Sequence, residues 1–319
     1  MITVLTGGTG GAKFVDGLRQ VVPTENLSII VNTGDDLMWW GLYVSPDIDS
    51  ITYVLAGLLS RERGWGVKGD TFFCLQAMGQ LGEPIWFHAG DRDLAVHILR
   101  SKLLAEGKTL SEVSAQIAEK LGVKARIIPM SNSRVETRVM TPIGELSFEE
   151  YFVQRWFQDP VESVRFAGAA DAEPAPGVID AILAADTLLL APSNPITSIG
   201  PILAVPGVRE ALQRTKARIA AVSPIVAGAA VSGPAGILMS AQGLEVSIAG
   251  VAQYYQDFLD VLVVDERDAE AADELRKSGL RVETAKTMMR TNEDRADLAH
   301  ATLLAVSGQN ATHAETNLS

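Results

Sequence analysis

The chain is poor in cysteine, in long apolar runs and in positive charge. Cys74 is the only cysteine among 319 residues, which excludes an internal disulfide. Its apolar neighbours Phe72, Phe73 and Leu75 predict a buried thiol rather than a catalytic one. No apolar run reaches the roughly 20 residues that a membrane-spanning helix needs.

The net charge of −12 argues against a surface for nucleic acid or anionic membranes. A single phosphate site remains possible, because backbone N–H groups bind phosphate without net charge. The apolar start at residues 1–5 has no basic flank and meets glycines at once, unlike a signal peptide. We therefore expect a soluble, cytoplasmic protein.

Several catalytic patterns are also missing. The chain has no HExxH or CxxC motif and no Ser-His-Asp order, so zinc-enzyme and serine-hydrolase interpretations lack support.

Short apolar segments alternate with amphipathic ones along most of the chain. The expected strands are residues 2–6, 27–32, 126–128, 187–191, 218–222 and 261–264. The expected helices include residues 49–59, 110–121, 177–184 and 269–278. Nearly all-apolar strands that alternate with helices indicate an α/β fold, a Rossmann-like parallel sheet with helices on both faces.

The middle of the chain departs from this alternation. Residues 135–140 and 144–148 flank a turn at residues 141–144, which predicts a β-hairpin. We expect one domain over residues 1–308, with an inserted helical and hairpin subdomain at about 70–166. Residues 309–319 are polar and aperiodic and are predicted to form a flexible tail.

A glycine-rich turn at residues 7–13 (GGTGGAK) follows the first expected strand and opens a helix. Glycines let the backbone approach a phosphate, and the helix start directs N–H groups and a positive dipole end at it. The residues expected to hold phosphate are Gly8, Thr9, Gly10, Gly11 and Lys13. The alternative is a tight turn without a ligand. Lys13 precedes Phe14, so the turn is not a P-loop.

Three other polar loops also follow expected strands, at residues 32–36, 192–195 and 223–228. In a parallel sheet such loops share one edge, where ligands bind. We expect them to converge with the glycine turn on one site. Ser193 and Asn194 can then present hydroxyl and amide groups to a base or ribose.

Four carboxylates, Asp35, Asp36, Asp47 and Asp49, follow the second strand closely. Carboxylates this near one another repel unless a cation or hydrogen-bond donors neutralise them, and Mg²⁺ is the natural cation beside phosphate. Capping of the next helix by Asp47 or Asp49 is the alternative for one of them.

Aromatic residues and a second polar cluster lie near these carboxylates in sequence. Trp39, Trp40 and Tyr43 stack on a flat heterocycle or pack in the core; the sequence leaves both open. In the cluster at residues 86–100, Asp91 or Asp93 is a candidate helix cap, and we expect a structural rather than catalytic role for His97.

Taken together, these motifs resemble the 2-phospho-L-lactate transferase family of deazaflavin coenzyme F-420 biosynthesis. The resemblance extends to about residue 298. Its motifs are residues 7–13 (GGTGGAK), 32–36 (NTGDD), 45–49 (SPDID), 63–66 (RGWG), 90–95 (GDRDLA), 129–131 (PMS), 192–195 (PSNP), 198–203 (SIGPIL) and 223–225 (SPI).

The resemblance implies a Mg²⁺-assisted, GMP-releasing transferase with a Rossmann-like fold that assembles as a homodimer. Its donor would be a phosphorylated three-carbon acid linked to guanosine, and its acceptor the deazaflavin precursor. By resemblance Asp49 and His88 contact the deazaflavin, although a longer basic residue is common at the position of His88. Asp35, Asp36 and Asp49 are the predicted metal ligands, and Asp35 and Asp49 the predicted catalytic residues.

Two other functions fit parts of the pattern. A non-enzymatic regulator that binds nucleotide sugars would share the glycine turn and the carboxylate loop, but the match at residues 90–95 and 192–203 argues against it. An NAD-dependent dehydrogenase would carry an acidic residue at the end of the second strand, and this chain has none there.

Overall fold

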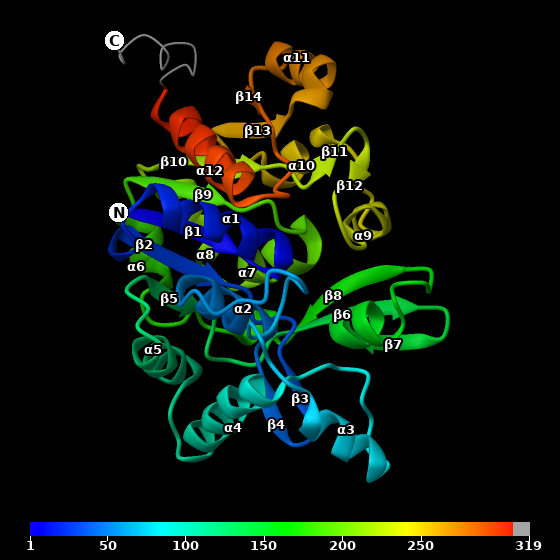
Figure 1. The fold of residues 1–319 in the computed structure, drawn as a ribbon. Coiled ribbons are helices and arrows are strands. Elements are labelled where there is room, and N and C mark those ends of the chain that lie inside the picture. Colours follow the sequence, from blue (N-terminus) through cyan, green and yellow to red (C-terminus); the bar gives the residue numbers. More distant parts are fainter. Residues whose placement is uncertain (309–319) are drawn as a thin grey trace.

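The computed structural model describes residues 1–308, and the predicted tail at 309–319 lies outside them. A seven-stranded parallel sheet forms the centre, in the order β14-β13-β10-β9-β1-β2-β5. Its strands are β1 (Ile2–Thr6), β2 (Leu27–Val31), β5 (Arg126–Pro129), β9 (Thr187–Leu190), β10 (Arg218–Val222), β13 (Val261–Asp265) and β14 (Arg281–Ala285). The Rossmann-like α/β prediction is confirmed (Figure 1).

Twelve α-helices and several shorter turns of helix surround the sheet in the described chain. The α-helices are α1 (Gly8–Val21), α2 (Pro46–Leu55), α3 (Phe73–Gln80), α4 (Asp91–Ala105), α5 (Leu110–Lys120), α6 (Val178–Leu183), α7 (Gly200–Ala204), α8 (Val208–Arg214), α9 (Ala235–Ala241), α10 (Ile248–Tyr255), α11 (Ala269–Lys277) and α12 (Asn292–Ser307). The π-helical turns η2 (Glu150–Gln154) and η4 (Pro195–Ile199) matter for the site, and η1 (Thr24–Asn26), η3 (Ala169–Asp171) and η5 (Glu266–Asp268) are 3₁₀ turns.

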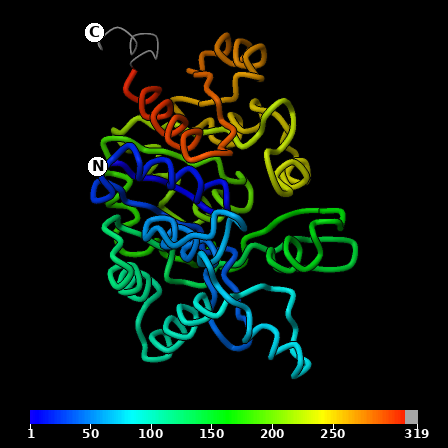
Figure 2. Tube along the Cα trace, in the orientation of Figure 1, coloured from blue at the N-terminus to red at the C-terminus, as the bar shows by residue number. Residues whose placement is uncertain are grey.

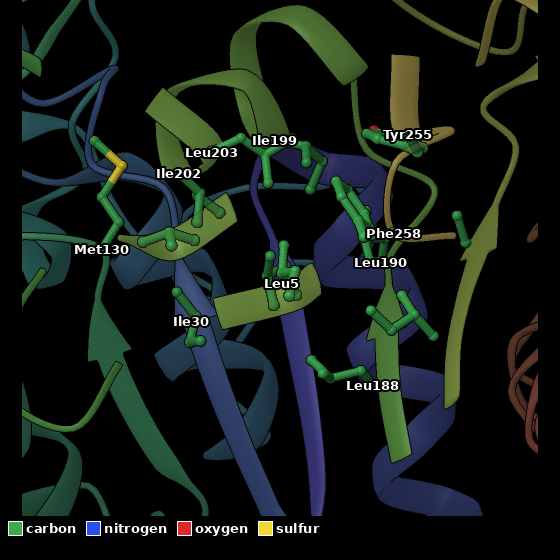
Figure 3. Packing of buried hydrophobic residues seen from close by; sticks show 14 of the residues in the cluster. Leu5, Ile30, Met130, Leu188, Leu190, Ile199, Ile202, Leu203, Tyr255 and Phe258 are labelled. Atoms are coloured by element: carbon green, nitrogen blue, oxygen red, sulfur yellow. The ribbon is translucent and has the colours of Figure 1, made fainter. Parts of the chain in front are cut away.

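The core has two halves because successive side chains of a strand point to opposite faces. Val4 of β1 and Ile29 of β2 pack with α1, α2 and α12 on one face. Leu5 and Ile30 point to the other face, where Ile199 and Ile202 cover them (Figure 3). Burial on both faces explains why these strands are apolar throughout rather than alternating.

The predicted hairpin is confirmed and gains a third strand. Strands β6 (Glu136–Thr141), β7 (Gly144–Ser147) and β8 (Ser163–Ala167) form an antiparallel sheet in the order β7-β6-β8. The sheet projects beside the main one (Figure 1). Two further pairs are β3 (Leu37–Trp39) with β4 (Leu42–Val44) and β11 (Ile225–Val226) with β12 (Ala229–Ala230).

Two expectations need correction, and one strand was missed. The helix expected at residues 49–59 begins at Pro46, because proline suits the first turn, and ends at Leu55 before Gly57 turns with φ +70°. Strand β14 was not expected, since its sequence RVETA is polar enough for the sheet edge that it forms. Cys74 is exposed, not buried, because α3 lies on the surface and buries only Leu75.

No helix of the described chain combines the length and apolar character that crossing a bilayer requires.

Helices α1 and α12, from opposite ends of the described chain, lie side by side (Figure 2). Asp16 of α1 accepts a hydrogen bond of 2.6 Å from buried Arg295 of α12. A methyl group at Gly17 would overlap the backbone carbonyl of Arg295, so only glycine permits this approach.

We predict that Gly17→Ala lowers the free energy of unfolding by about 1–3 kcal/mol, the usual cost of overpacking. Urea denaturation measures it. Gly79→Ala in α3 is the matched control, because its new methyl group would meet only the side-chain end of Ile85, 3.3 Å away. Equal stability of Gly17→Ala and wild type would contradict the close approach.

Candidate active site at the carboxyl edge of the sheet

The order of the strands reverses between β1 and β9, and polar loops meet at that point. From β1 the chain moves outward to β2 and β5, and from β9 it moves the other way to β10, β13 and β14. Such a reversal opens a crevice at the carboxyl ends of the strands. A hollow of about 270 Å³ near Ala217 and Asp260 lies at the opposite edge, away from these loops.

The predicted convergence of loops is confirmed for the glycine turn and the loops after β2 and β9. The Ser193 hydroxyl donates to the carbonyl of Gly7 (2.7 Å) and accepts from the Gly7 N–H (3.3 Å). Asn32, directly after β2, donates to the carbonyl of Thr197 (3.2 Å). These bonds join the ends of β1, β2 and β9.

Asn32 also organises the carboxylates, a role that the sequence analysis missed. Its amide nitrogen lies 3.0 Å from Asp35 Oδ2 and 2.9 Å from Asp47 Oδ2. Its carbonyl oxygen accepts from the N–H of Gly34 (2.8 Å), which fixes the amide orientation. A buried amide directly after an apolar strand is the signal that would have identified it.

The glycine turn bends tightly against its neighbours. Gly8 has φ +67°, which favours glycine, and its N–H donates to Asp47 Oδ1 (2.7 Å). A side chain at Gly10 would meet the carbonyl of Pro192, and one at Gly11 would meet Thr6 and Ser193. Close packing therefore accounts for Gly10 and Gly11, and the first helical N–H is already used by a carboxylate.

The other residues predicted for phosphate or nucleotide differ in exposure. Thr9 is exposed, whereas Lys13 is half-buried. Burial, helped by the charge of Arg295, lowers the pKa of Lys13. Asn194 uses its carbonyl oxygen to cap η4 through the Ile196 N–H (3.0 Å), which leaves its amide group as the available donor.

A cluster of four carboxylates lies beside the turn: Asp35, Asp36, Asp47 and Glu149. Glu149 lies between β7 and η2, and the sequence analysis missed it. Burial, reinforced by the charges of Asp47 and Glu149, raises the pKa of Asp35 well above its usual value. Burial likewise raises the pKa of Asp47 to about 6 and that of Glu149 to about 8.

Asp36 points to a different set of partners. It accepts from the hydroxyls of Tyr43 (2.8 Å) and Ser45 (2.6 Å), and burial raises its pKa to about 8. Tyr43 is thus engaged through its hydroxyl. Trp39 is buried and packs edge-on against Trp86 with ring centroids 4.8 Å apart. Of the two alternatives for Trp39, the structure therefore shows packing in the core.

Asp49 belongs to a second network around Arg100. The fully buried Arg100 guanidinium donates to both carboxylate oxygens of Asp49, one at 3.1 Å. His97 Nδ1 lies 3.5 Å from Asp49, and the Tyr53 hydroxyl donates to Asp93 (2.6 Å). Ligand atoms of Asp49, Asp93 and His97 lie within 4.8 Å of one another, close enough for a metal ion. Arg100 already supplies a positive charge there.

The remaining acidic residues of this region cap helices. Asp91 accepts from the N–H groups of Phe73 (3.1 Å) and Cys74 (2.9 Å), which caps α3. Asp70 accepts from the N–H of Arg92 (2.8 Å) and caps α4 in return. Asp91 is thus a cap, as one alternative predicted, but of the preceding helix.

His88 is exposed on a loop and lies beside the aromatic side chains of Trp65 and Phe72. Its ring centroid is 6.3 Å from that of Trp65, and Arg63 stacks over Trp65 and Phe72 at 5.3 and 5.1 Å. Within residues 1–308 no hydrogen bond or ion pair joins His88 to Asp49.

The fold and this edge define a doubly wound α/β protein with an acidic, glycine-flanked site at its topological switch point. The model of the 2-phospho-L-lactate transferase CofD family matches residues 2–305. The chain therefore belongs to the 2-phospho-L-lactate transferase family, a family of transferase enzymes, as the resemblance predicted.

Curated relatives agree with the family assignment. The 2-phospho-L-lactate transferase of Methanosarcina acetivorans is 44% identical over 93% of this chain and 96% of its own. That of Methanothermobacter thermautotrophicus is 43% identical over 95% and 97%. A protein of Streptomyces coelicolor named phosphoenolpyruvate transferase is 41% identical, again over 95% and 97%.

A solved structure shares the fold. A UPF0052 family member from Bacillus halodurans superposes with a TM-score of 0.63 at 16% identity, over 95% of this chain and 98% of that one.

The buried carboxylates predict how stability varies with pH when divalent cations are removed. Their pKa values are higher in the folded protein than the usual value near 4, so the folded state holds protons more tightly. That contribution is complete below about pH 4 and is lost as pH rises towards about 8.

We therefore expect the melting temperature in EDTA to fall from about pH 5 to about pH 8. Carboxyls whose pKa is lowered, such as Asp265 at about 2, complete their contribution below this window and do not offset the loss. A melting temperature that is constant or rises across the window would contradict the buried cluster.

Proposed function

We propose that the protein transfers a phosphorylated three-carbon acid from a guanosine diphosphate-linked donor to 7,8-didemethyl-8-hydroxy-5-deazariboflavin. The acceptor's terminal ribityl oxygen forms a bond to the phosphorus that carries the acid. The bond from that phosphorus to the bridging anhydride oxygen breaks, GMP leaves with this oxygen, and the hydroxyl proton is released. The observation that carries the proposal is a glycine turn and buried carboxylates at the switch point of a chain in this transferase family.

The cluster beside the glycine turn has the chemistry of a divalent-cation site. Asp35 is buried, and its polar neighbours, the Thr137 hydroxyl and the Asn32 amide, carry no charge. Asp35 and Asp47 share the amide of Asn32, which neutralises neither charge. Oxygen ligands of this kind suit Mg²⁺, so the residues present fit the metal that the family resemblance implies.

We assign the cation to Asp35 and Asp47 rather than to the full predicted set. Of the predicted ligands, Asp36 is engaged by Tyr43 and Ser45, and Asp49 by Arg100. When bound, Mg²⁺ would offset charge on the diphosphate. The available N–H groups at the start of α1, with Lys13, would bind the remaining phosphate oxygens.

Asp49 is the proposed contact for the acceptor hydroxyl. Its bidentate pair with Arg100 fixes the direction of its oxygens. Phosphoryl transfer depends mainly on positioning and on charge neutralisation, so a held carboxylate that accepts the hydroxyl proton meets the chemical need. His88 beside Trp65 would support the flat deazaflavin ring, and Ser193 and Asn194 would line the guanosine side.

The three-carbon acid stays open, because relatives of nearly equal identity are named for the transfer of two different acids, 2-phospho-L-lactate and phosphoenolpyruvate. The homodimer and the cytoplasmic location that the resemblance implies stay predictions as well.

The activity is tested by incubation of the protein with Mg²⁺, the fluorescent deazaflavin precursor and each guanylylated donor in turn: phospholactate, phosphoenolpyruvate and phosphoglycerate. We expect one product of higher mass and one GMP per product, as measured by mass spectrometry and nucleotide chromatography. Fluorescence titration tests acceptor binding separately. No product with any donor would contradict the proposed reaction.

We predict that Asp49→Asn binds both substrates but transfers about 10²–10⁴-fold more slowly, since an amide cannot accept the hydroxyl proton. Asp273→Asn on the exposed surface of α11 is the charge-matched control and should retain full activity. Turnover near that of the wild type in Asp49→Asn would rule out the proton-accepting role.

A further inference from the structure

The network around Arg100 extends from Asp49 through helix α4 and returns to helix α2. The Tyr53 hydroxyl of α2 donates to Asp93 Oδ1 of α4 (2.6 Å). The other carboxylate oxygen of Asp93 lies 3.6 Å from His97 Nε2, one helical turn further along α4. His97 Nδ1 lies 3.4 Å from Arg100 Nη1, and the same Nη1 donates to Asp49 Oδ2 (3.1 Å).

Helical spacing and burial make this network a fixed one. Asp49 and Tyr53 are four residues apart on α2, as Asp93 and His97 are on α4, so each pair shares one face of its helix. His97 and Tyr53 are only 1% exposed, and Arg100 is fully buried. Since solvent does not reach these side chains, each polar group depends on the others for its hydrogen bonds.

The partners of His97 determine where its ring proton lies. A guanidinium only donates, so His97 Nδ1 is the acceptor in its contact with Arg100. The ring proton then lies on Nε2, which faces the acceptor Asp93 Oδ2. His97 Nδ1 and Asp49 Oδ2, two acceptors 3.5 Å apart, thus share the donor Arg100 Nη1. The imidazole therefore restricts the group that holds Asp49.

A metal ion is the alternative for these residues, because ligand atoms of Asp49, Asp93 and His97 lie within 4.8 Å of one another. The two carboxylates approach different nitrogens of the imidazole, however, and a neutral imidazole has only one nitrogen lone pair to offer an ion. Arg100 also neutralises Asp49 already. Hydrogen bonding therefore accounts for the whole cluster.

We propose that His97 is a positioning residue for the transfer reaction. Asp93 and Tyr53 hold its ring in place. The ring fixes the Arg100 guanidinium, which directs the oxygens of Asp49 towards the acceptor hydroxyl. The inference rests on the proposed function, in which Asp49 accepts the hydroxyl proton. His97 touches neither substrate in this role and acts only through its neighbours.

Steady-state kinetics of His97→Leu and His97→Asn provide the first test. We expect His97→Leu to lower kcat about 10–100-fold, the effect of losing one hydrogen bond to a charged group, with KM for both substrates close to that of the wild type. His97→Asn should retain more of kcat, because its amide oxygen can take the place of Nδ1 as acceptor.

His300→Leu on the exposed surface of α12 is the matched control and should keep full activity. Fluorescence titration with the deazaflavin precursor measures the fraction of each variant that folds and binds. A purely structural role would lower that fraction and leave kcat per binding molecule unchanged. That result, or equal losses of kcat in His97→Leu and His97→Asn, would overturn the inference.

Histidine-selective nitrogen-15 NMR tests the inference in the wild type without substrates. The chain has four histidines, and the signal of His97 is the one absent from the spectrum of His97→Asn. We expect this ring to carry its proton on Nε2 and none on Nδ1. A proton on Nδ1 would overturn the inference, because it would exclude the contact with Arg100.

The double variant Asp49→Asn/His97→Leu separates this inference from the proposed function. Because His97 acts through Asp49, the double variant should transfer no more slowly than Asp49→Asn alone. A slow Asp49→Asn whose loss multiplies with that of His97→Leu would overturn only the role of His97. A wild-type rate in Asp49→Asn would contradict the proton-accepting role in the proposed function, and this inference with it.

Discussion

The shared hydrogen bonding of Asn32 is the constraint on which the site depends. Its one amide group holds two carboxylates and the η4 loop, and its carbonyl oxygen fixes the following turn. Parallel strands bring their ends to one edge without specifying which side chains meet there. Asn32 determines which side chains meet at this edge, because a buried amide can donate to several acceptors only if all of them lie in the right place.

Helix α2 divides the acidic residues between two networks. Asp47 and Asp49 are two positions apart, and residues at that spacing lie on nearly opposite sides of a helix. Asp47 accordingly bonds Gly8 and Asn32, whereas Asp49 faces Arg100. One network is neutralised by a guanidinium, and the other has no positive partner in the described chain. In the proposed reaction, the single short motif PDID would thus contribute one carboxylate to each substrate side.

Sequence patterns predicted the parts of the structure that local rules determine. The apolar strands, the glycine turn and the edge where the loops converge follow from periodicity and from parallel topology. Glu149 and Arg100 did not, because their significance comes from contacts 51 or more residues away that no local pattern encodes. The prediction that Cys74 is buried was wrong for a related reason. Apolar neighbours predict burial only if another element covers them, and no element of residues 1–308 covers Cys74 on α3.

The acidity of the site restricts how it can handle an anionic donor. A diphosphate that approaches Asp35, Asp47 and Glu149 is repelled unless a cation occupies the same space. The N–H of Gly8, which would otherwise bind phosphate, already bonds Asp47. In the proposed reaction, the cation and the donor would therefore bind beside the same hydrogen bonds, and the glycine turn and the carboxylates would act as one site. A generic phosphate turn has no such coupling, and it arises here because α2 directs Asp47 at the turn.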